Sequence, residues 1–456
     1  MRNFLIVWLP RAAAAFFAVA IFLLTWRVGW PWAALKFSEF FFALALGSLG
    51  LTLMISAPAR ARLWRILLVL RVEGRWLGLL LLAAVIGHAA SIFLSLDWQA
   101  YAGEIWLEYS RLLLSVLLFF AVIYLCVAFR NLNAYLLGIV IVSPLTLWAS
   151  LFPAWYRVFF LAVDERLRGP GSDPNYLGSW LGLGVITAFA VFLWARGGRR
   201  WLGLSGMVGL FPLLLWTSSR GAILAVGLGF AATGLKYVLG GFTLRRAGSV
   251  ATALTALLVG FWLSFAAAPP PVRAAITDRL VVPFVGRQSA IVMFLNPGLR
   301  AASGSLSGVE APVFELGADR RKLFFGGGRL LLGHPFGFGP AYYRWQPVAY
   351  AGDGAKLGPH NLFLEAGLTG GYLGLIALLG FLWSIARRLA GFSSGENWVG
   401  GALIGCFVAL LAVSFSLDTL TLRWLWLIMG LVVARSLDSD LTIASSEGLR
   451  DNGDES

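Results

Sequence analysis

Long apolar runs recur from one end of the chain to the other. Each holds about 20 residues, which is enough to cross a bilayer as a helix. The runs are continuously apolar and do not alternate with a period of two residues, so they do not resemble the strands of a membrane β-barrel. Of the 456 residues, 59% are hydrophobic and 13% are charged, whereas a soluble domain carries about 25% charged residues. The sequence therefore predicts an all-α polytopic membrane protein.

The apolar runs predict about twelve transmembrane helices. Their expected ranges are 5–26, 36–56, 76–95, 110–129, 132–152, 175–195, 201–217, 220–240, 248–267, 361–386, 398–417 and 420–436. Residues 1–267 then hold helices 1–9, residues 268–359 form one long loop, and residues 360–436 hold helices 10–12. Residues 437–456 are polar and acidic, and we expect this tail to be disordered.

The net charge of +14 reflects membrane topology. Most of the arginines lie in short loops, so the charge does not indicate nucleic acid as a partner. With the N-terminus in the cytoplasm, the inner loops and helix ends carry roughly twice as many Lys and Arg residues as the short outer ones. The positive-inside rule therefore places both termini in the cytoplasm and the long loop on the outer side.

The long outer loop carries ten Lys and Arg residues against five Asp and Glu residues between 268 and 358. Long outer loops escape the positive-inside rule, so this surplus fits an anionic ligand or attraction to lipid headgroups. Residues 275–294 have the pattern of a helix lying flat on the membrane. A second helix is expected from Asp319 to Leu332, ending where Gly333 and Pro335 force a turn.

Arg220 is expected at the outer start of the eighth span. A helix N-terminus presents free N–H groups and a positive dipole, and an arginine there can grip phosphate oxygens with two parallel hydrogen bonds. Gly221 directly after it permits close approach of the backbone. The alternative is an arginine that only anchors the helix end at the membrane surface.

His360 stands at the start of the tenth span, next to Asn361. Its ordinary pKa near 6.5 suits a general base at neutral pH. A purely structural role as a polar helix cap is served equally well by Asn361, so such a role does not require the histidine. The pair predicts proton exchange with a substrate at the boundary between water and lipid.

The other polar candidates have simpler explanations. Asp173 and Asn175 can cap the sixth span, with a second possible role in shaping the site. Arg320 and Arg321 open the second loop helix as a basic, solvated turn. His334 precedes a proline and is expected to be structural, and His88 is expected to pack between helices. No paired carboxylates stand in the outer loops, so neither a metal nor another cofactor is expected.

Taken together and in order, these motifs resemble the O-antigen ligase and polymerase superfamily. The matching segments, between about 173 and 386, are Asp173-Pro174-Asn175, Ser219-Arg220-Gly221-Ala222, Arg320, Gly333-His334-Pro335-Phe336-Gly337-Phe338-Gly339 and His360-Asn361-x-x-Leu364-Glu365 with Gly367 and Gly370. One departure is Phe324, where a tryptophan is common in the family. It leaves open which of Arg320 and Arg321 matches the family's loop arginine.

The resemblance implies a membrane fold of the GT-C-like type in the bacterial inner membrane, with residues 268–359 as a periplasmic loop containing short helices. It implies transfer of a glycan from undecaprenyl pyrophosphate to a sugar acceptor at the periplasmic face, without metal. His360 would be catalytic, and Arg220 with Arg320 or Arg321 would bind the donor, with Asn361, Asp173 and Asn175 lining the substrate site.

Within the family, the expected activity is that of an O-antigen ligase, with lipid A–core as the acceptor and inversion at the anomeric carbon. The nearest alternative is a polymerase that joins undecaprenyl-linked repeat units. A transporter of polysaccharide or lipid is an alternative from another class, since twelve spans also fit that. A sensor or structural membrane protein is a third. The basic surplus and the His–Asn pair gather on one face, which favours an enzyme there.

Overall fold

The structure is a computed structural model of the whole chain. It describes residues 2–23, 37–93, 99–129, 131–151, 166–168, 173–241, 243–281, 315–344, 347–350, 356–392, 397–417, 420 and 422–450. The side chains of 2–4, 37, 150–151, 281, 315–321, 344, 349–350, 356–357 and 438–450 lie outside this description.

Almost all of the described secondary structure is helical. The helices are α1 (Arg2–Phe22), α2 (Phe37–Ile55), α3 (Ala57–Val69), α4 (Arg71–Phe93), α5 (Ala102–Ala128), α6 (Leu132–Leu145), α8 (Pro174–Trp194), α9 (Gly198–Trp216), α10 (Arg220–Leu239), α11 (Leu244–Ala267), α12 (Pro270–Ile276), α16 (Glu315–Gly333), α17 (Leu362–Ala390), α18 (Trp398–Ser414) and α19 (Arg423–Arg450). Short helical turns occupy Gln99–Tyr101, Thr146–Leu151, Thr277–Val281 and Tyr342–Arg344. One antiparallel pair joins β1 (Ala349–Tyr350) to β2 (Lys356–Leu357).

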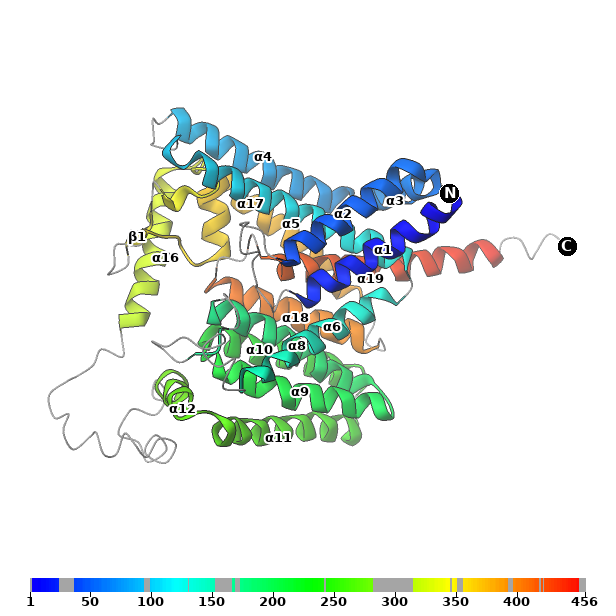
Figure 1. Cartoon of the computed structure of the whole chain (residues 1–456), viewed down its shortest axis with the longest axis vertical. Helices are drawn as coiled ribbons and strands as arrows, with labels where there is room; N and C mark the ends of the chain where they lie inside the picture. Colours follow the sequence, from blue (N-terminus) through cyan, green and yellow to red (C-terminus); the bar gives the residue numbers. More distant parts are fainter. Residues whose placement is uncertain are drawn as a thin grey trace.

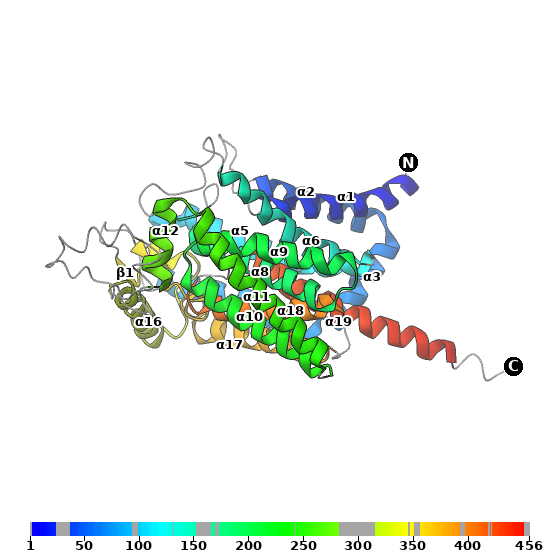
Figure 2. The same cartoon turned by 90° about the horizontal axis from the view of Figure 1, so that it is seen from below.

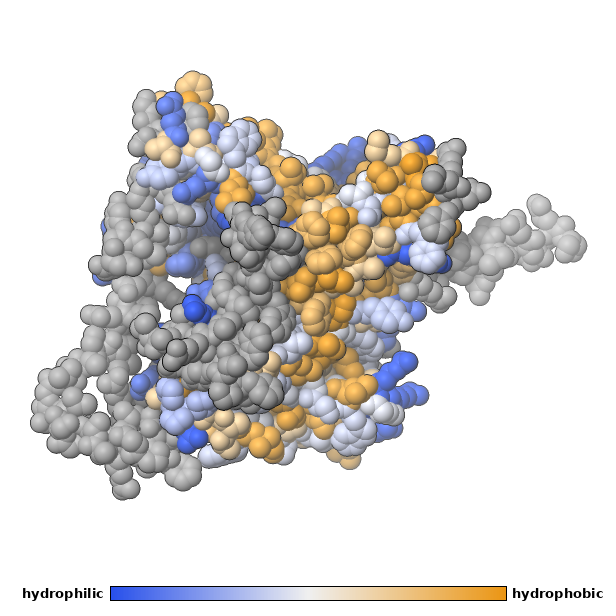
Figure 3. Space-filling model, in the orientation of Figure 1, coloured by the Kyte–Doolittle hydropathy of each residue, from blue (hydrophilic) through white to orange (hydrophobic). Residues whose placement is uncertain are grey.

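Nine helical segments in the described part of the chain are long and apolar enough to cross a membrane. All nine coincide with spans that the sequence predicts. The three other predicted spans, 201–217, 398–417 and 420–436, are also largely helical, in α9, α18 and α19, although the apolar helix α18 is shorter. Figure 3 shows hydrophobic surface over the middle of the helices, with hydrophilic residues toward both ends. The protein is thus a multi-pass helical membrane protein in its architecture.

The long helices lie side by side, and the two ends of the bundle differ. The start of α1 and the end of α19 lie at one end, while α12, α16 and β1 lie at the other (Figure 1). α12 crosses the direction of α11 in both views (Figures 1 and 2). We call the end that carries α12 and α16 the loop end. The start of α1 and the end of α19 both lie at the opposite end of the bundle, which agrees with an even number of membrane crossings.

Helix boundaries depart from the sequence predictions in several places. The helix expected over 275–294 begins earlier, at Pro270, because prolines fit the first turn of a helix; residues 282–294 lie outside the described part. α19 continues to Arg450, beyond the span predicted over 420–436, and neither Pro nor Gly occurs between Gly430 and Gly448. α3 was not expected; Ser56 caps it by accepting a hydrogen bond from the N–H of Ala59.

α17 is broken near its start. Gly370 and Gly371 have non-helical dihedral angles, with φ of +64° at Gly371. The break frees the carbonyls of Leu368 and Thr369, which accept hydrogen bonds from the N–H groups of Phe338 and Gly339 at 2.7 and 2.9 Å. The turn that follows α16 therefore docks into the break in α17 and replaces the missing helical hydrogen bonds.

Close packing at this junction explains the glycines of the turn. Gly337 and Gly339 have φ of +75° and +81°, a region that favours glycine. A Cβ on Gly87 of α4 would lie 2.2 Å from the carbonyl oxygen of Thr369. The loop backbone thus runs between α4 and α17 where only glycine leaves room.

An ion pair joins α4 to the opposite end of α17. The guanidinium of Arg388 donates to both carboxylate oxygens of Glu73, at 2.7 and 3.1 Å. The side chain of Glu73 is only 3% exposed. Arg388 also donates to the hydroxyl of Ser436 at 3.0 Å, so α19 joins the same contact. Together with the docked turn, this pair holds α17 against α4 at both of its ends.

Candidate functional site

The start of α10 presents Arg220 at the loop end. Ser219 caps the helix, and its hydroxyl accepts from the N–H of Ala222. Arg220 is the first helical residue and is exposed; its Nε donates to the carbonyl of Arg279 at 2.6 Å. A cation at a helix N-terminus opposes the dipole, so this placement favours a bound anion.

The start of α17 presents His360. This residue has φ of +47°, which is uncommon for a side chain other than glycine, asparagine or aspartate. The next residue, Asn361, is 3% exposed and caps α17 by accepting from the N–H groups of Phe363 and Leu364, each at 3.0 Å. Because Asn361 takes the cap, the half-buried His360 lies just before the helix without serving as its cap.

The end of α18 touches both helix starts. A Cβ on Gly221 would lie 2.7 Å from Oγ of Ser416. The side-chain amide of Asn361 donates to the carbonyl of Phe415 at 3.3 Å, and the rings of Phe363 and Phe415 lie 4.9 Å apart. The structure therefore brings the neighbourhoods of Arg220 and His360 together across Phe415 and Ser416, the two residues that directly follow α18. It also explains Gly221, since the close approach it permits is to Ser416.

Asp173 and Asn175 lie at the start of α8, next to the same corner. Asp173 caps α8 by accepting from the N–H of Asn175 at 2.7 Å, which is the role that the sequence favours. A Cβ on Gly178 would lie 2.8 Å from Oγ1 of Thr217 and 3.0 Å from Cβ of Ser219. The first turn of α8 thus packs against the turn that leads into Arg220.

Arg166 has a role that sequence reasoning missed. It is 6% exposed, and its Nε donates to the carbonyl of Thr217 at 2.8 Å while Nη2 donates to Oδ1 of Asn175 at 3.1 Å. It therefore connects α8 to the turn before Arg220. The only signal in the sequence is an arginine in an outer loop, which is indistinguishable from a solvated one.

Arg320 and Arg321 lie in the second turn of α16, and their side chains lie outside the described part of the chain. Further along α16, a Cβ on Gly327 would lie 3.5 Å from Cβ of Pro359, the residue before His360. The helix that carries both arginines is thus packed against the segment that carries the histidine. Which arginine faces that segment stays a prediction.

Positive charge gathers around the start of α10. The N–H of Leu167 donates to the carbonyl of Trp216, close to the start of α10, and Arg168 is the next residue. Arg273 belongs to α12, and Arg279 to the turn after it. With Arg220, these arginines and the positive ends of α8, α10 and α17 create a potential that attracts anions at the loop end.

The two other histidines have structural surroundings. The ring of His334 lies 4.3 Å from that of Phe338, and its Nδ1 lies 3.1 Å from the carbonyl of Leu330. His88 packs its ring edge against Tyr109, with centroids 5.9 Å apart. Both agree with the roles expected from the sequence.

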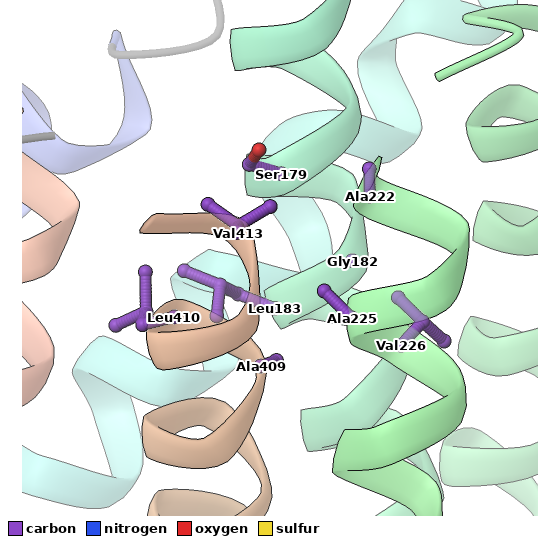
Figure 4. Close-up of a pocket in the computed structure, with 9 residues that line it drawn as sticks. All are labelled: Ser179, Gly182, Leu183, Ala222, Ala225, Val226, Ala409, Leu410 and Val413. Atoms are coloured by element: carbon purple, nitrogen blue, oxygen red, sulfur yellow. The ribbon is translucent and has the colours of Figure 1, made fainter. Parts of the chain in front are cut away.

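A narrow crevice lies between α8, α10 and α18, beneath the start of α10 (Figure 4). It is lined by Ser179, Gly182, Leu183, Ala222, Ala225, Val226, Ala409, Leu410 and Val413. These side chains are apolar or small, and none is charged; the hydroxyl of Ser179 donates to the carbonyl of Asn175.

In the part of the chain that the structure describes, no three His, Cys, Asp or Glu side chains gather as metal ligands would. The groups at the site are guanidinium donors, one imidazole and helix N-termini. Such a set can bind an anion and can accept a proton from a neighbouring hydroxyl. Neither a scan against models of protein families nor a search of curated proteins finds a match to this chain.

Proposed function

We propose that this protein is an O-antigen ligase: a glycosyltransferase that moves O-antigen polysaccharide from undecaprenyl pyrophosphate to a sugar of the lipid A–core. The observation that supports this best is the meeting of two helix starts at the end of α18. One carries an arginine suited to pyrophosphate, and the other carries a histidine suited to proton transfer. Both kinds of group are needed to move a sugar from a phosphate to a hydroxyl.

In the proposed reaction, Arg220 and one of Arg320 and Arg321 hold the donor pyrophosphate. The acceptor hydroxyl attacks the anomeric carbon, and the bond from that carbon to the pyrophosphate oxygen breaks. His360 takes the hydroxyl proton, and the arginines stabilise the charge that develops on the leaving pyrophosphate. Direct displacement inverts the configuration of the anomeric carbon. Guanidinium groups and helix dipoles supply the positive charge, so the proposal requires no metal or other cofactor.

The setting of the proposal is the bacterial inner membrane. In this proposal the protein has about twelve spans in a GT-C-like arrangement, with both termini in the cytoplasm and the loop end in the periplasm. The polyprenyl chain of the donor and the acyl chains of the acceptor lie in the bilayer, and their polar groups meet at its outer surface. Asn361, Asp173 and Asn175 border the substrate site in this arrangement, chiefly by fixing the helix starts.

The two alternatives differ in what they do with the same substrates. A polymerase uses the same donor but passes the glycan to another lipid-linked repeat. A transporter moves the lipid-linked glycan without breaking a bond. The exposed position of Arg220 and the half-buried position of His360 at one end of the bundle favour chemistry at a surface over passage through the bundle.

Reconstitution distinguishes all three. Purified protein in liposomes is given undecaprenyl-pyrophosphate-linked glycan with lipid A–core, or the same donor alone. We expect glycan to appear on lipid A–core in the first mixture and no lengthening of the lipid-linked glycan in the second. Lengthening in the donor-only mixture would establish the polymerase. Movement of intact donor between leaflets, with no transfer, would establish the transporter.

A further inference from the structure

One face of α16 presents a stripe of exposed side chains. Lys322, Phe325, Arg329 and Leu332 recur at helical spacing, and Phe336 continues the stripe into the following turn. Phe325, Leu332 and Phe336 are 64%, 74% and 62% exposed. The stripe lies largely on the opposite side of α16 from the seam that packs on α17. That seam consists of the buried residues Leu323, Gly327 and Leu331.

The turn after α16 packs against α4 well inside the tip of that helix. A Cβ on Gly87 of α4 would lie 3.0 Å from the carbonyl oxygen of Phe336. Gly87 precedes Phe93, the last residue of α4, by six residues, or about 9 Å of helix. The side chain of Phe93 is 88% exposed. The turn at Phe336 therefore lies further into the helix bundle than the exposed apolar tip of α4.

The stripe is continuous with the lipid-facing surface of α17. The N–H of Tyr372 donates to the carbonyl of Pro335 at 2.9 Å, which fixes Phe336 beside this helix. Tyr372, Ile376 and Leu379 are 40%, 55% and 47% exposed on one face of α17, which is a membrane-spanning candidate. Figure 1 shows the C-terminal end of α16 beside α4 and α17, with α16 running across the end of the bundle.

The charges on the stripe match a phosphate-bearing surface. Arg329 and Lys322 are exposed and lie between or beside the apolar residues. An amphipathic helix in the plane of the membrane has this composition, with Phe and Leu toward the acyl chains and Lys or Arg toward the headgroups.

We infer that the C-terminal half of α16 is an interfacial helix that docks on the outer leaflet of the bilayer. Leu332 and Phe336 lie at the boundary between acyl chains and headgroups, Phe325 lies at headgroup level, and Arg329 binds lipid phosphate. The occupant of this face is anionic phospholipid. The inference does not depend on glycosyl transfer, because it concerns how the loop end is fixed to the membrane.

Fluorescence quenching tests this inference. Leu332→Cys and Phe336→Cys variants are labelled with the fluorophore NBD and reconstituted in liposomes of phosphatidylethanolamine and phosphatidylglycerol. The native Cys126 and Cys406 are buried, so the label goes to the introduced cysteine. Ile376→Cys serves as the lipid-facing control. Arg199→Cys, exposed in the first turn of α9, serves as the water-facing control.

We expect labels at 332 and 336 to lose emission to a nitroxide carried near the top of the lipid chains, and to be protected from aqueous iodide, as at 376. The label at 199 should show the reverse pattern. Two outcomes would overturn the inference. Quenching of 332 and 336 by iodide alone would place the stripe in water. Protection from both quenchers would place it under protein, either another segment or a second copy of the chain.

Discussion

His360 holds a left-handed backbone conformation, with φ of +47°, directly before a fully formed helix cap. Such conformations cost free energy and concentrate at functional sites, where the surrounding structure enforces them. Here the enforcing contacts are those of Asn361, which is bonded to α17 on one side and to the end of α18 on the other. The backbone that carries the imidazole is therefore held in place by the neighbouring residue.

Substitution of His360 separates catalysis from folding. Asparagine tolerates the left-handed conformation and keeps hydrogen-bonding groups, but it cannot take a proton at neutral pH. We expect His360→Asn to fold normally and to lower turnover by about 10²–10⁴-fold, the usual worth of general base catalysis. Transfer rates of purified variants, normalised to folded protein, measure this. An Asn variant that works near the native rate would remove the general-base role.

Arg220 is expected to act through its planar guanidinium group, which can donate two parallel hydrogen bonds. Lysine retains the charge but cannot form two parallel hydrogen bonds to phosphate oxygens. It also lacks an equivalent of the Nε–H that donates to the carbonyl of Arg279. Arg220→Lys should therefore lose nearly as much transfer activity as Arg220→Ala. If lysine restores most of the rate, the arginine is a point charge or an anchor.

At the residue scale, the sequence predicted some structural roles and missed others. Asp173 caps a helix, as its type and place suggest. Gly221 permits a close approach, but to Ser416. Arg166 escaped notice because its burial depends on a contact with Thr217, which is 51 residues away in the chain. Contacts of that kind leave no periodic signal in the sequence.

At the scale of elements, the break in α17 links the outer loop to the membrane bundle. The sequence predicts a continuous span over 361–386, because glycine interrupts a helical pattern only weakly. The glycines Gly370 and Gly371 end the regular helix instead, and the turn after α16 completes its hydrogen bonds. This pairing depends on two segments meeting in space, so neither segment alone predicts it.

A pair of glycine substitutions tests this junction. A Cβ on Gly371 would lie 2.0 Å from the carbonyl oxygen of Pro335, and φ there is +64°. We expect Gly371→Ala to destabilise the protein by more than about 2 kcal/mol. Gly328→Ala in α16 meets no atom within 4 Å and should be neutral or gain up to about 1 kcal/mol. Thermal unfolding followed by a thiol-reactive dye at the buried cysteines compares them. Equal stability of the two variants would contradict the docked turn.

The ion pair between Glu73 and Arg388, at the other end of α17, allows a second comparison between two variants. Glu73→Gln leaves Arg388 without its carboxylate partner where both side chains are largely buried. The expected loss lies toward the lower end of the ~3–5 kcal/mol typical of a broken buried pair. The matched control is Glu108→Gln, which breaks a more exposed pair with Arg111 within α5 and should cost less than about 1 kcal/mol. Similar melting temperatures for both variants would show that the pair of Glu73 and Arg388 does not stabilise the packing of α4 against α17.

At the scale of the whole molecule, the positions of the membrane-spanning helices along the chain were the most predictable property. Helix length and apolar composition alone locate membrane spans, and all nine membrane-spanning candidates among the described residues coincide with predicted ones. The placement of both chain ends away from α16 also agrees with the distribution of arginines (Figure 1). The meeting of α8, α10, α17 and α18 could not be predicted, since hydropathy does not specify which helices are neighbours.

Cysteine labelling tests which side of the membrane the loop end occupies. Lys322 on α16 and Arg199 in the first turn of α9 are both exposed and can be replaced by cysteine, and the native cysteines are buried. In cells with a permeabilised outer membrane, an impermeant maleimide should label residue 322 and leave 199 unlabelled. Opening the inner membrane should then allow 199 to react. Labelling of 199 first would invert the topology and move the site to the cytoplasm.

The central claim is that Arg220 and His360 act on one substrate at one site. A double-mutant cycle in the transfer rate, with Arg220→Lys, His360→Asn and the double variant, measures this most directly. Residues that serve the same transition state are strongly non-additive. The account predicts that the double variant is slower than the worse single variant by no more than about tenfold. Losses that multiply in full would show that the two residues act independently, and would contradict a shared site.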